Sequence, residues 1–197
     1  MALYRSLIRI FSGQARLSRS QVDRQSQTVG GAPNSSSSRH FSQVEAMRTV
    51  ALTNDYIAQD NEMCMFATIF FAVLNPKNGK LIYINGGHET AFVIDRRGIK
   101  KRLSPTGPAV GLIPQAQFEF KRVQLQPGEI LFAYTDGVID ARSINEERFS
   151  RKRLISLLSQ PVAAASELMQ KIGTNLFAHI GKAPQEDDIT MLTLQRK

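Results

Sequence analysis

Apolar and polar positions along this chain follow two different periods, and the change between them predicts the order of its elements. Between Ser42 and about Asn61 the apolar residues recur every three to four positions, which predicts an amphipathic helix. Ser42 followed by Glu45 has the spacing of a capping box and marks the start of that helix. From Met65 to Leu74 the chain is continuously apolar, which predicts a strand covered on both faces. The inward-facing residues expected on the helix are Met47, Val50, Asn54 and Ile57.

Antiparallel strand pairs separated by turn residues are predicted for the middle of the chain, and helices follow them. The order favours an α+β domain in which antiparallel sheets are flanked by helices. No glycine-rich phosphate loop, nucleophile elbow or Cys/His zinc spacing is present. The predicted strand pairs are 65–74 with 81–85, 91–95 with 99–103, and 117–125 with 129–134; the later helices are 151–159 and 162–179, and the closing strand is 189–194.

The first forty residues admit two interpretations. Leu3, Leu7 and Ile10 fall on one helical face, so residues 1–12 are expected to form a core-packing helix. The Arg- and Ser-rich, acid-free start is also typical of a mitochondrial transit peptide, which leaves an imported organellar protein as an alternative. Residues 18–40 are polar and nearly free of large apolar side chains, which predicts a flexible loop.

Composition excludes several classes of function. The 197 residues suit one domain, and a single cysteine, Cys64, allows no internal disulfide, so a reducing cytoplasm is expected. The longest apolar run, Met63 to Leu74, is shorter than the roughly 20 residues that a membrane helix needs. Of the formal charge of +8, residues 1–50 contribute seven Arg minus Asp23 and Glu45, which is +5. No basic recognition helix accompanies this charge, so nucleic-acid binding is not expected.

Three polar constellations stand at predicted strand ends. Asp136 and Gly137 follow a buried strand, where a plain Asp-Gly turn is the alternative to a site. Asp187 and Asp188 precede the last strand; adjacent acids repel unless water solvates them or a cation binds them. The segment 85–88 reads Asn-Gly-Gly-His, which also suits a tight turn.

Taken in order, these segments and several neighbours resemble the SpoIIE-like branch of the PPM-type (protein phosphatase 2C-like) serine/threonine phosphatases. The resemblance covers about residue 41 to the C-terminus and extends less specifically to residues 1–12. It rests on the segments Met65-Phe66-Ala67-Thr68, Asn85-Gly86-Gly87-His88, Gly107 to Leu112, Pro127-Gly128-Glu129, Tyr134-Thr135-Asp136-Gly137-Val138 and Asp187-Asp188-Ile189-Thr190.

The resemblance implies an α/β/β/α sandwich of two antiparallel sheets, with two Mn²⁺ or Mg²⁺ ions at one edge. It implies that Asp136 and Asp187 are metal ligands, that Gly137 allows close backbone approach, and that Asp188 neighbours the site. The remaining near-site residues are Asn85 and His88. The implied substrate is a phosphoserine or phosphothreonine protein, such as an anti-sigma-factor antagonist in bacterial signalling, and the implied location is the cytoplasm.

One departure from the family pattern concerns the N-terminus. The family begins upstream with a segment that supplies further metal-binding aspartates and leads into a helix resembling residues 1–7. We therefore expect residues 1–197 to be one N-terminally truncated phosphatase domain, with the 18–40 loop inside it and little activity by itself. The alternative is a non-catalytic phosphatase-fold module that binds a signalling partner. An exposed sheet edge is also expected, which a dimer or a partner would cover.

Overall fold

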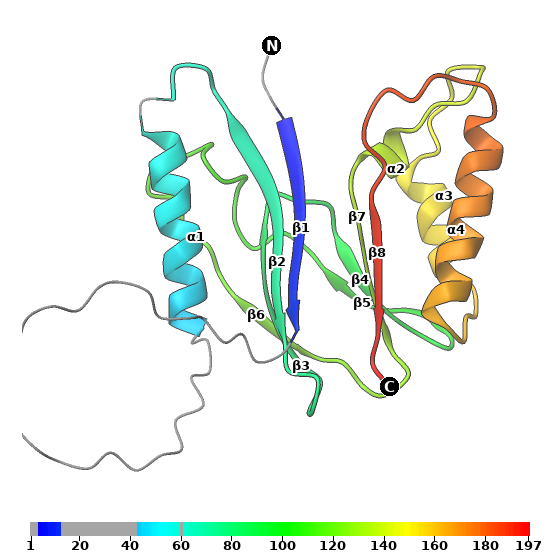
Figure 1. Cartoon of the computed structure of the whole chain (residues 1–197), viewed down its shortest axis with the longest axis horizontal. Coiled ribbons are helices and arrows are strands. Elements are labelled where there is room, and N and C mark those ends of the chain that lie inside the picture. The colour runs from blue at the N-terminus through cyan, green and yellow to red at the C-terminus, as the bar shows by residue number, and fades with distance from the viewer. Residues whose placement is uncertain (1–3, 13–42, 60) are drawn as a thin grey trace, which may run out of the picture.

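Two four-stranded sheets lie face to face, with helices packed on both outer sides (Figure 1). The computed structural model describes residues 4–12, 43–59 and 61–197, and for 4–12 and 43–47 it describes only the backbone. The first sheet has the strand order β1-β2-β3-β6 and the second has the order β5-β4-β7-β8. The elements are β1 (Tyr4–Ser12), α1 (Gln43–Ala58), β2 (Phe66–Leu74), β3 (Lys80–Gly86), β4 (Ala91–Asp95), β5 (Gly98–Leu103), β6 (Lys121–Gln124), β7 (Ile130–Tyr134), α2 (Gly137–Asp140), α3 (Arg151–Leu158), α4 (Ala165–Ile180) and β8 (Met191–Gln195).

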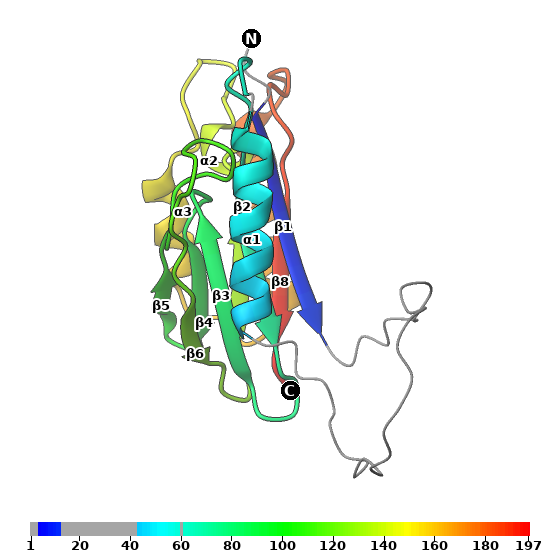
Figure 2. The ribbon, with the colours of Figure 1, turned by 90° about the vertical axis from the view of Figure 1, so that its left-hand side faces the viewer.

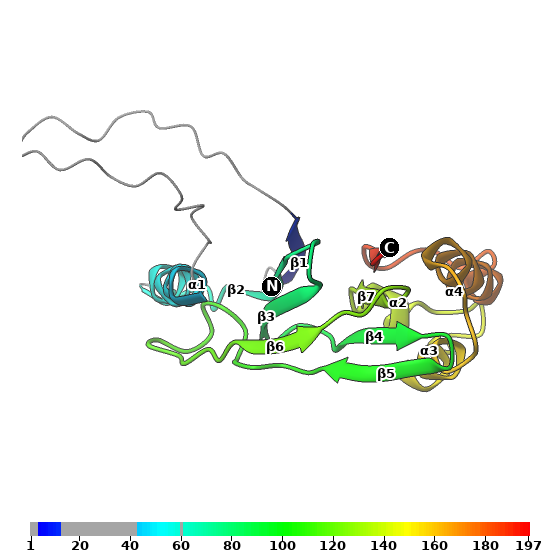
Figure 3. The ribbon, with the colours of Figure 1, turned by 90° about the horizontal axis from the view of Figure 1, so that it is seen from below.

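Within the described residues, three apolar clusters hold the layers together. The first lies between the sheets and includes Phe70 and Leu131. The second joins α1 to the first sheet through Val50 and Ile84. The third packs α3 and α4 on the second sheet, and the stripe of α4 in it consists of Leu168, Ile172 and Leu176. Seen from below, α1 lies at one end of this stack and α4 at the other, with the sheets between them (Figure 3). The layered α+β class expected from the sequence is confirmed.

Most element predictions are confirmed. The helix expected from Ser42 is α1, in which Val50 and Asn54 are buried, and the two later helices are α3 and α4. The hairpins β2–β3 and β4–β5 pair antiparallel as expected. The short helix α2 was not predicted, because its sequence suits a turn as well as a helical turn. The expected loop at 18–40 lies outside the described residues.

The prediction of a helix over residues 1–12 is wrong. Of these residues, Tyr4–Ser12 form β1, which pairs in parallel with β2 over nine positions, from Tyr4 opposite Phe66 to Ser12 opposite Leu74, while residues 1–3 lie outside the described residues. Figures 1 and 2 show β1 running beside β2, on the side of β2 away from α1. The apolar residues of this segment fit a helical face, but Ile8, Ile10 and Phe11 also favour a strand, and pairing with β2 outweighs the local period. The first sheet is therefore antiparallel except at this edge strand.

The predicted pairing of 117–125 with 129–134 is also wrong. The residues around Pro127 and Gly128 connect the two sheets instead of closing a hairpin: β6 pairs with β3, whereas β7 pairs with β4 and β8. All five residues of β7 are buried, as suits a strand with neighbours on both edges and layers on both faces. β7 is therefore an interior strand of the second sheet, and Asp136 follows shortly after its C-terminal end.

No helix in the described part of the chain is long and apolar enough to cross a membrane.

Candidate metal and phosphoryl site

The end of β7 leads directly into the first candidate acid. Thr135 is buried, Asp136 is half-buried, and the helix α2 begins at Gly137. Asp136 caps α2: its Oδ1 accepts from the Gly137 N–H at 3.1 Å, and its carbonyl accepts from the Asp140 N–H at 2.9 Å. This cap fixes the backbone that carries the carboxylate at the end of a buried strand.

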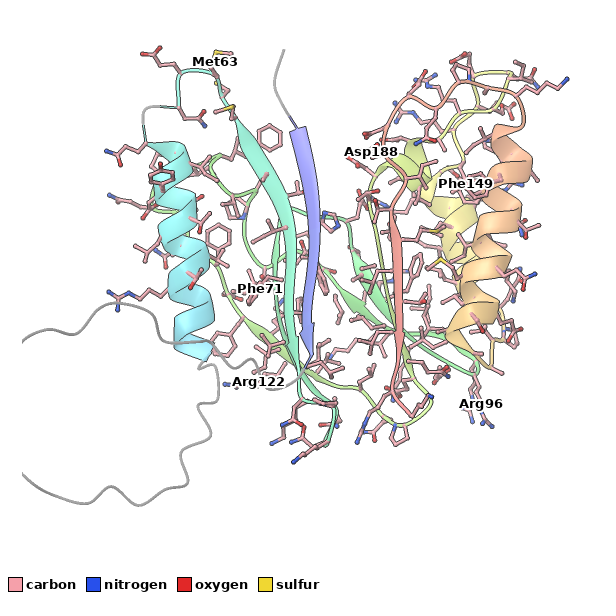
Figure 4. All side chains as sticks on the ribbon, viewed as in Figure 1. Met63, Phe71, Arg96, Arg122, Phe149 and Asp188 are labelled. Atoms are coloured by element: carbon pink, nitrogen blue, oxygen red, sulfur yellow. The ribbon has the colours of Figure 1, made fainter. Side chains whose placement is uncertain are left out.

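The second candidate acid reaches the same place from the far end of the chain. The Thr135 hydroxyl donates to the Asp188 carbonyl at 2.9 Å and accepts from the Thr190 N–H at 3.0 Å. The Thr135 N–H donates to the Thr190 carbonyl at 3.0 Å. Figure 4 shows Asp188 beside α2 at the upper end of β8. The structure therefore brings the Asp136 and Asp187–Thr190 segments together, joined through Thr135.

Gly137 makes this close approach possible. A Cβ at Gly137 would lie 2.4 Å from the Asp188 carbonyl oxygen, far inside contact distance. Asp187 is exposed, and its Oδ1 accepts from the Asp188 N–H at 2.7 Å. The resemblance implies that Gly137 allows close backbone approach at a metal site; the approach that the structure describes is to the Asp188 carbonyl.

A small hollow that is open to solvent lies next to this junction. Gly137 and Asp187 line it together with Arg142, whose guanidinium pairs with Glu186 at 3.3 Å and with Glu146 at 3.1 Å. Solvent therefore reaches the site from the α2 side. The remaining lining residues are Asp140, Ala141, Ile180, Pro184, Gln185, Glu186 and Ile189.

The loop that contains Asn85 and His88 borders the candidate site on another side. Asn85 is buried: its Oδ1 accepts from the His88 N–H at 2.9 Å, while its Nδ2 donates to the carbonyls of Leu103 at 3.1 Å and Glu89 at 3.2 Å. Asn85 is thus a structural clamp for the loop. Gly87 has φ +64°, and a Cβ there would meet the Ala109 backbone at 2.7 Å, so this position requires glycine.

His88 lies inside the protein, and its ring senses the charge of Asp136. The residue is 3% exposed, and its Nδ1 is 3.0 Å from the Thr68 hydroxyl. Burial lowers the pKa of His88 below the ordinary value of 6.5, while the nearby charges of Glu89 and Asp136 oppose that shift. The sequence placed His88 only near the site; the structure puts its ring within the electrostatic reach of Asp136.

Glu89 ties this loop to β7 and α3. Arg151 Nη2, from the first turn of α3, donates to Glu89 Oε1 at 2.9 Å and to Oε2 at 2.8 Å. The Tyr134 hydroxyl donates to Glu89 Oε2 at 3.1 Å. Burial, followed by the nearby Glu89 charge, raises the pKa of Tyr134 far above its ordinary value, so the phenol remains a donor. The sequence analysis did not predict Glu89 and Arg151, because no motif marks them. Thr135 belongs to the motif 134–138, but nothing in that motif indicates the hydrogen bonds of its hydroxyl.

The candidate ligands are of the type that a hard divalent cation prefers, but there are too few of them to hold one. Carboxylates such as those of Asp136 and Asp187 are the ligands that Mn²⁺ and Mg²⁺ prefer. Across the described ranges, however, no three His, Cys, Asp or Glu side chains are grouped so that they could hold a metal ion. Asp136 and Asp187 by themselves are therefore fewer than the ligands that such an ion needs.

Comparison with known proteins identifies the class. Residues 36–197 match the family described as Stage II sporulation protein E (SpoIIE). The chain belongs to this family of PPM-type serine phosphatase domains, as the resemblance predicted. Phosphatases of this type use metal ions.

Two curated relatives support the assignment. Protein IcfG of Synechocystis sp. is 42% identical over all 197 residues, which is 31% of that protein's length. Phosphoserine phosphatase RsbU of Bacillus subtilis is 25% identical over 73% of this chain and 43% of its own length. The chain thus spans less than half the length of either relative.

Solved structures share the fold. A bacterial serine phosphatase superimposes with a TM-score of 0.55 at 14% identity, over 81% of this chain and 71% of that one. PppA of Pseudomonas aeruginosa gives a TM-score of 0.54 at 17% identity, over 76% of this chain and 68% of that one. At these identities the likeness establishes the fold alone.

Proposed function

We propose that this chain is the part of a metal-dependent protein serine/threonine phosphatase that contributes Asp136 and Asp187 as metal ligands. The observation that supports it most is the junction of two distant segments, in which Thr135 binds the backbone of Asp188 and Thr190. The junction places one acid from each segment at the end of the second sheet. A purely structural turn would not need two acidic segments at one point.

This chain's residues would orient the site. Asp136 is held by its cap and Asp187 by the neighbouring N–H, so each carboxylate starts from a defined backbone position. Mn²⁺ or Mg²⁺ there would supply an activated water and neutralise phosphoryl oxygens, two ions being the expected complement. The open hollow beside Gly137 gives a phosphorylated side chain a way in.

The substrate proposed is a phosphoserine- or phosphothreonine-bearing regulatory protein of bacterial signalling, such as an anti-sigma-factor antagonist, and the location proposed is the cytoplasm. RsbU, the relative called a phosphoserine phosphatase, supports this substrate class. The non-catalytic binding module remains the second candidate, because the described residues provide too few ligands for two ions.

The test is release of phosphate from a phosphoserine peptide in millimolar Mn²⁺. It compares this chain with a version extended upstream by about sixty-five residues, a length chosen from the size that the resemblance implies for the family's domain. We expect slow turnover by this chain, faster turnover by the extended one, and loss in both on Asp136→Asn. The matched control is Asp95→Asn, an aspartate at the end of β4 that does not line the hollow and whose Oδ1 accepts from the Arg97 N–H, which asparagine can also do. Turnover that survives Asp136→Asn would contradict the proposed site, and binding of the phosphopeptide without turnover by either version would favour the binding module.

A further inference from the structure

On one side of the sandwich, the outer strand of each sheet is rich in basic residues. β5 is an edge strand of the second sheet and β6 is an edge strand of the first, and within the described residues neither has a partner strand on its outer side. Figures 2 and 3 both show β5 and β6 on the side of the sandwich opposite β1 and β8. The exposed basic residues of the two strands, here called the basic edge surface, are Lys100, Lys101, Arg102, Lys121 and Arg122.

Few acids neutralise the basic edge surface. Lys100 pairs with Glu129. Lys101, Arg102 and Lys121 have no ion-pair partner in the part of the chain that the structure describes. Charges on an edge strand also prevent unwanted pairing with other sheets, but that role does not require the charged groups to be held in place.

Both arginines of the basic edge surface are held in place by aromatic rings. The guanidinium of Arg102 lies 5.6 Å from the centre of the Phe92 ring, and that of Arg122 lies 4.8 Å from the centre of the Phe120 ring. A guanidinium that stacks on a ring can still bind a carboxylate in the plane of its N–H groups. Side chains that are fixed in advance lose less entropy when a partner binds, so this arrangement favours binding of an anionic group.

β5 leads to the candidate site. Its last residue, Leu103, lies opposite Ala91 in β4, and the Leu103 carbonyl accepts from Asn85 Nδ2 at 3.1 Å. This end of β5 therefore borders the loop 85–89. Only β4 separates β5 from β7, which puts β5 about 10 Å from the strand that leads to Asp136. A segment that lies along β5 thus ends next to the candidate site.

The site itself is acidic and gives an anionic partner no attraction before cations bind. Asp136, Asp187 and Asp188 lie at the junction, and Asp140 and Glu186 line the hollow beside it. These carboxylates repel an acidic protein, whereas the basic edge surface attracts one. Packed sheets lie about 10 Å apart, so basic side chains from β5 and β6 can reach the same extended segment.

We propose that the basic edge surface is a docking site for an extended acidic segment of the phosphoprotein substrate, bound with its phosphorylated residue toward Asp136. Such a segment offers carboxylates to the Lys and Arg side chains and backbone groups to the outer edge of β5. A narrow surface lined by strand edges suits an extended polypeptide better than a membrane or a nucleic acid. The identity of the partner as the substrate rests on the proposed function, but binding of an acidic segment can be tested without metal.

The first experiment measures peptide binding to the metal-free full chain by fluorescence anisotropy. The acidic probe is a labelled peptide of alternating Glu and Ser, and a peptide of alternating Gln and Ser is its uncharged counterpart. We expect the acidic probe alone to bind, and its binding to weaken as the salt concentration rises. Binding should become about 10-fold weaker in the edge triple variant, which combines Lys101→Gln, Arg102→Gln and Lys121→Gln.

A matched control removes the same charge from exposed positions elsewhere on the surface, by Arg48→Gln, Lys152→Gln and Lys182→Gln. This control should bind the acidic probe as the parent does. Equal weakening in the two triple variants, or no binding of the acidic probe by the parent, would overturn the inference. Tighter binding of phosphatidylserine-containing vesicles or of a DNA duplex than of the acidic probe, lost in the edge triple variant, would overturn the choice of partner.

Charge reversal distinguishes loss of the docking site from misfolding. Lys101→Glu, Arg102→Glu and Lys121→Glu together should lose the acidic probe and gain binding of a peptide of alternating Lys and Ser. A folded reversal variant that still binds the acidic probe as tightly as the parent would contradict the docking site.

The second experiment tests whether the docked segment belongs to the substrate. The upstream-extended version is assayed in Mn²⁺ on a phosphoserine peptide with and without an attached segment of alternating Glu and Ser. Docking contacts are the same in the ground state and the transition state, so the segment should lower KM and leave kcat unchanged, and the edge triple variant should abolish the difference. A KM that the segment does not change would overturn its assignment to the substrate. If neither peptide is turned over while the acidic probe binds, the proposed function fails and the docking site stands.

Discussion

Gly137 is the residue at which the two acidic segments come closest. Its α-carbon hydrogen faces the Asp188 carbonyl, and no side chain fits between them. An Asp-Gly pair in a sequence usually signals a turn, and here it also begins α2. The resemblance implies a role for Gly137 in backbone approach, and the group that it approaches, the Asp188 carbonyl about fifty residues away, is visible only in the fold.

Gly137→Ala should destabilise the fold by about 1–3 kcal/mol, because a Cβ 2.4 Å from a backbone oxygen forces the segments apart. It should also weaken Mn²⁺ binding, since Asp187 would move with Asp188. Urea unfolding and calorimetry give the two quantities.

The matched control is Gly173→Ala in α4, where nothing lies within 4 Å of an added Cβ. That change should stabilise the helix by up to about 1 kcal/mol and leave Mn²⁺ binding unaltered. Equal effects of the two substitutions would show that Gly137 has no special contact.

Among the elements, the pairing of β7 with β8 determines the site. Long apolar runs and periodic stripes predicted β2, β4, α1 and α4 correctly, because in each of them the local pattern and the packing agree. The spacing of apolar residues gave the wrong element for β1 and the wrong partner for β6. In both cases pairing with a strand distant in the sequence determines the structure: β1 pairs with β2, and β6 pairs with β3. The spacing of apolar residues along one strand does not indicate which sheet that strand joins.

Thr135→Val should loosen the end of this strand pair. The Thr135 hydroxyl links the Asp188 carbonyl and the Thr190 N–H, and valine keeps the shape while removing both bonds. The expected loss is about 1 kcal/mol, because solvent near the exposed Asp188 can replace part of the interaction. Amide hydrogen exchange should become faster at Thr190.

Thr193→Val is the corresponding control in β8. Thr193 lies opposite Phe132 in the same strand pair but makes no side-chain hydrogen bond within the described part of the chain. In Thr193→Val, amide hydrogen exchange at Thr190 and the free energy of unfolding should both stay near the values of the parent protein. If the Thr190 amide exchanges as slowly in Thr135→Val as in the parent, the backbone hydrogen bonds between β7 and β8 are sufficient to hold residues 188–190 in place.

At the scale of the whole molecule, the sandwich brings separate stretches of sequence to one end of the second sheet. The loop 85–89 from the region between the sheets, the end of β7 and the start of β8 meet there, and α3 is joined to them by the Arg151–Glu89 pair. The motifs indicated these stretches individually. Their mutual contacts through Thr135, Glu89 and His88 depend on tertiary structure, so the sequence could name the acids but not the residues that hold them.

The central claim is that Asp136 and Asp187 bind one and the same metal centre, and a double-mutant cycle on Mn²⁺ affinity tests it most directly. Calorimetry compares the parent with Asp136→Asn, Asp187→Asn, the double variant and the control Asp95→Asn. We predict that each single change weakens binding at least about 10-fold, that the double change is far less than additive, and that the control binds as the parent does. Independent, additive effects, or Mn²⁺ affinity unaltered by either change, would contradict a shared site.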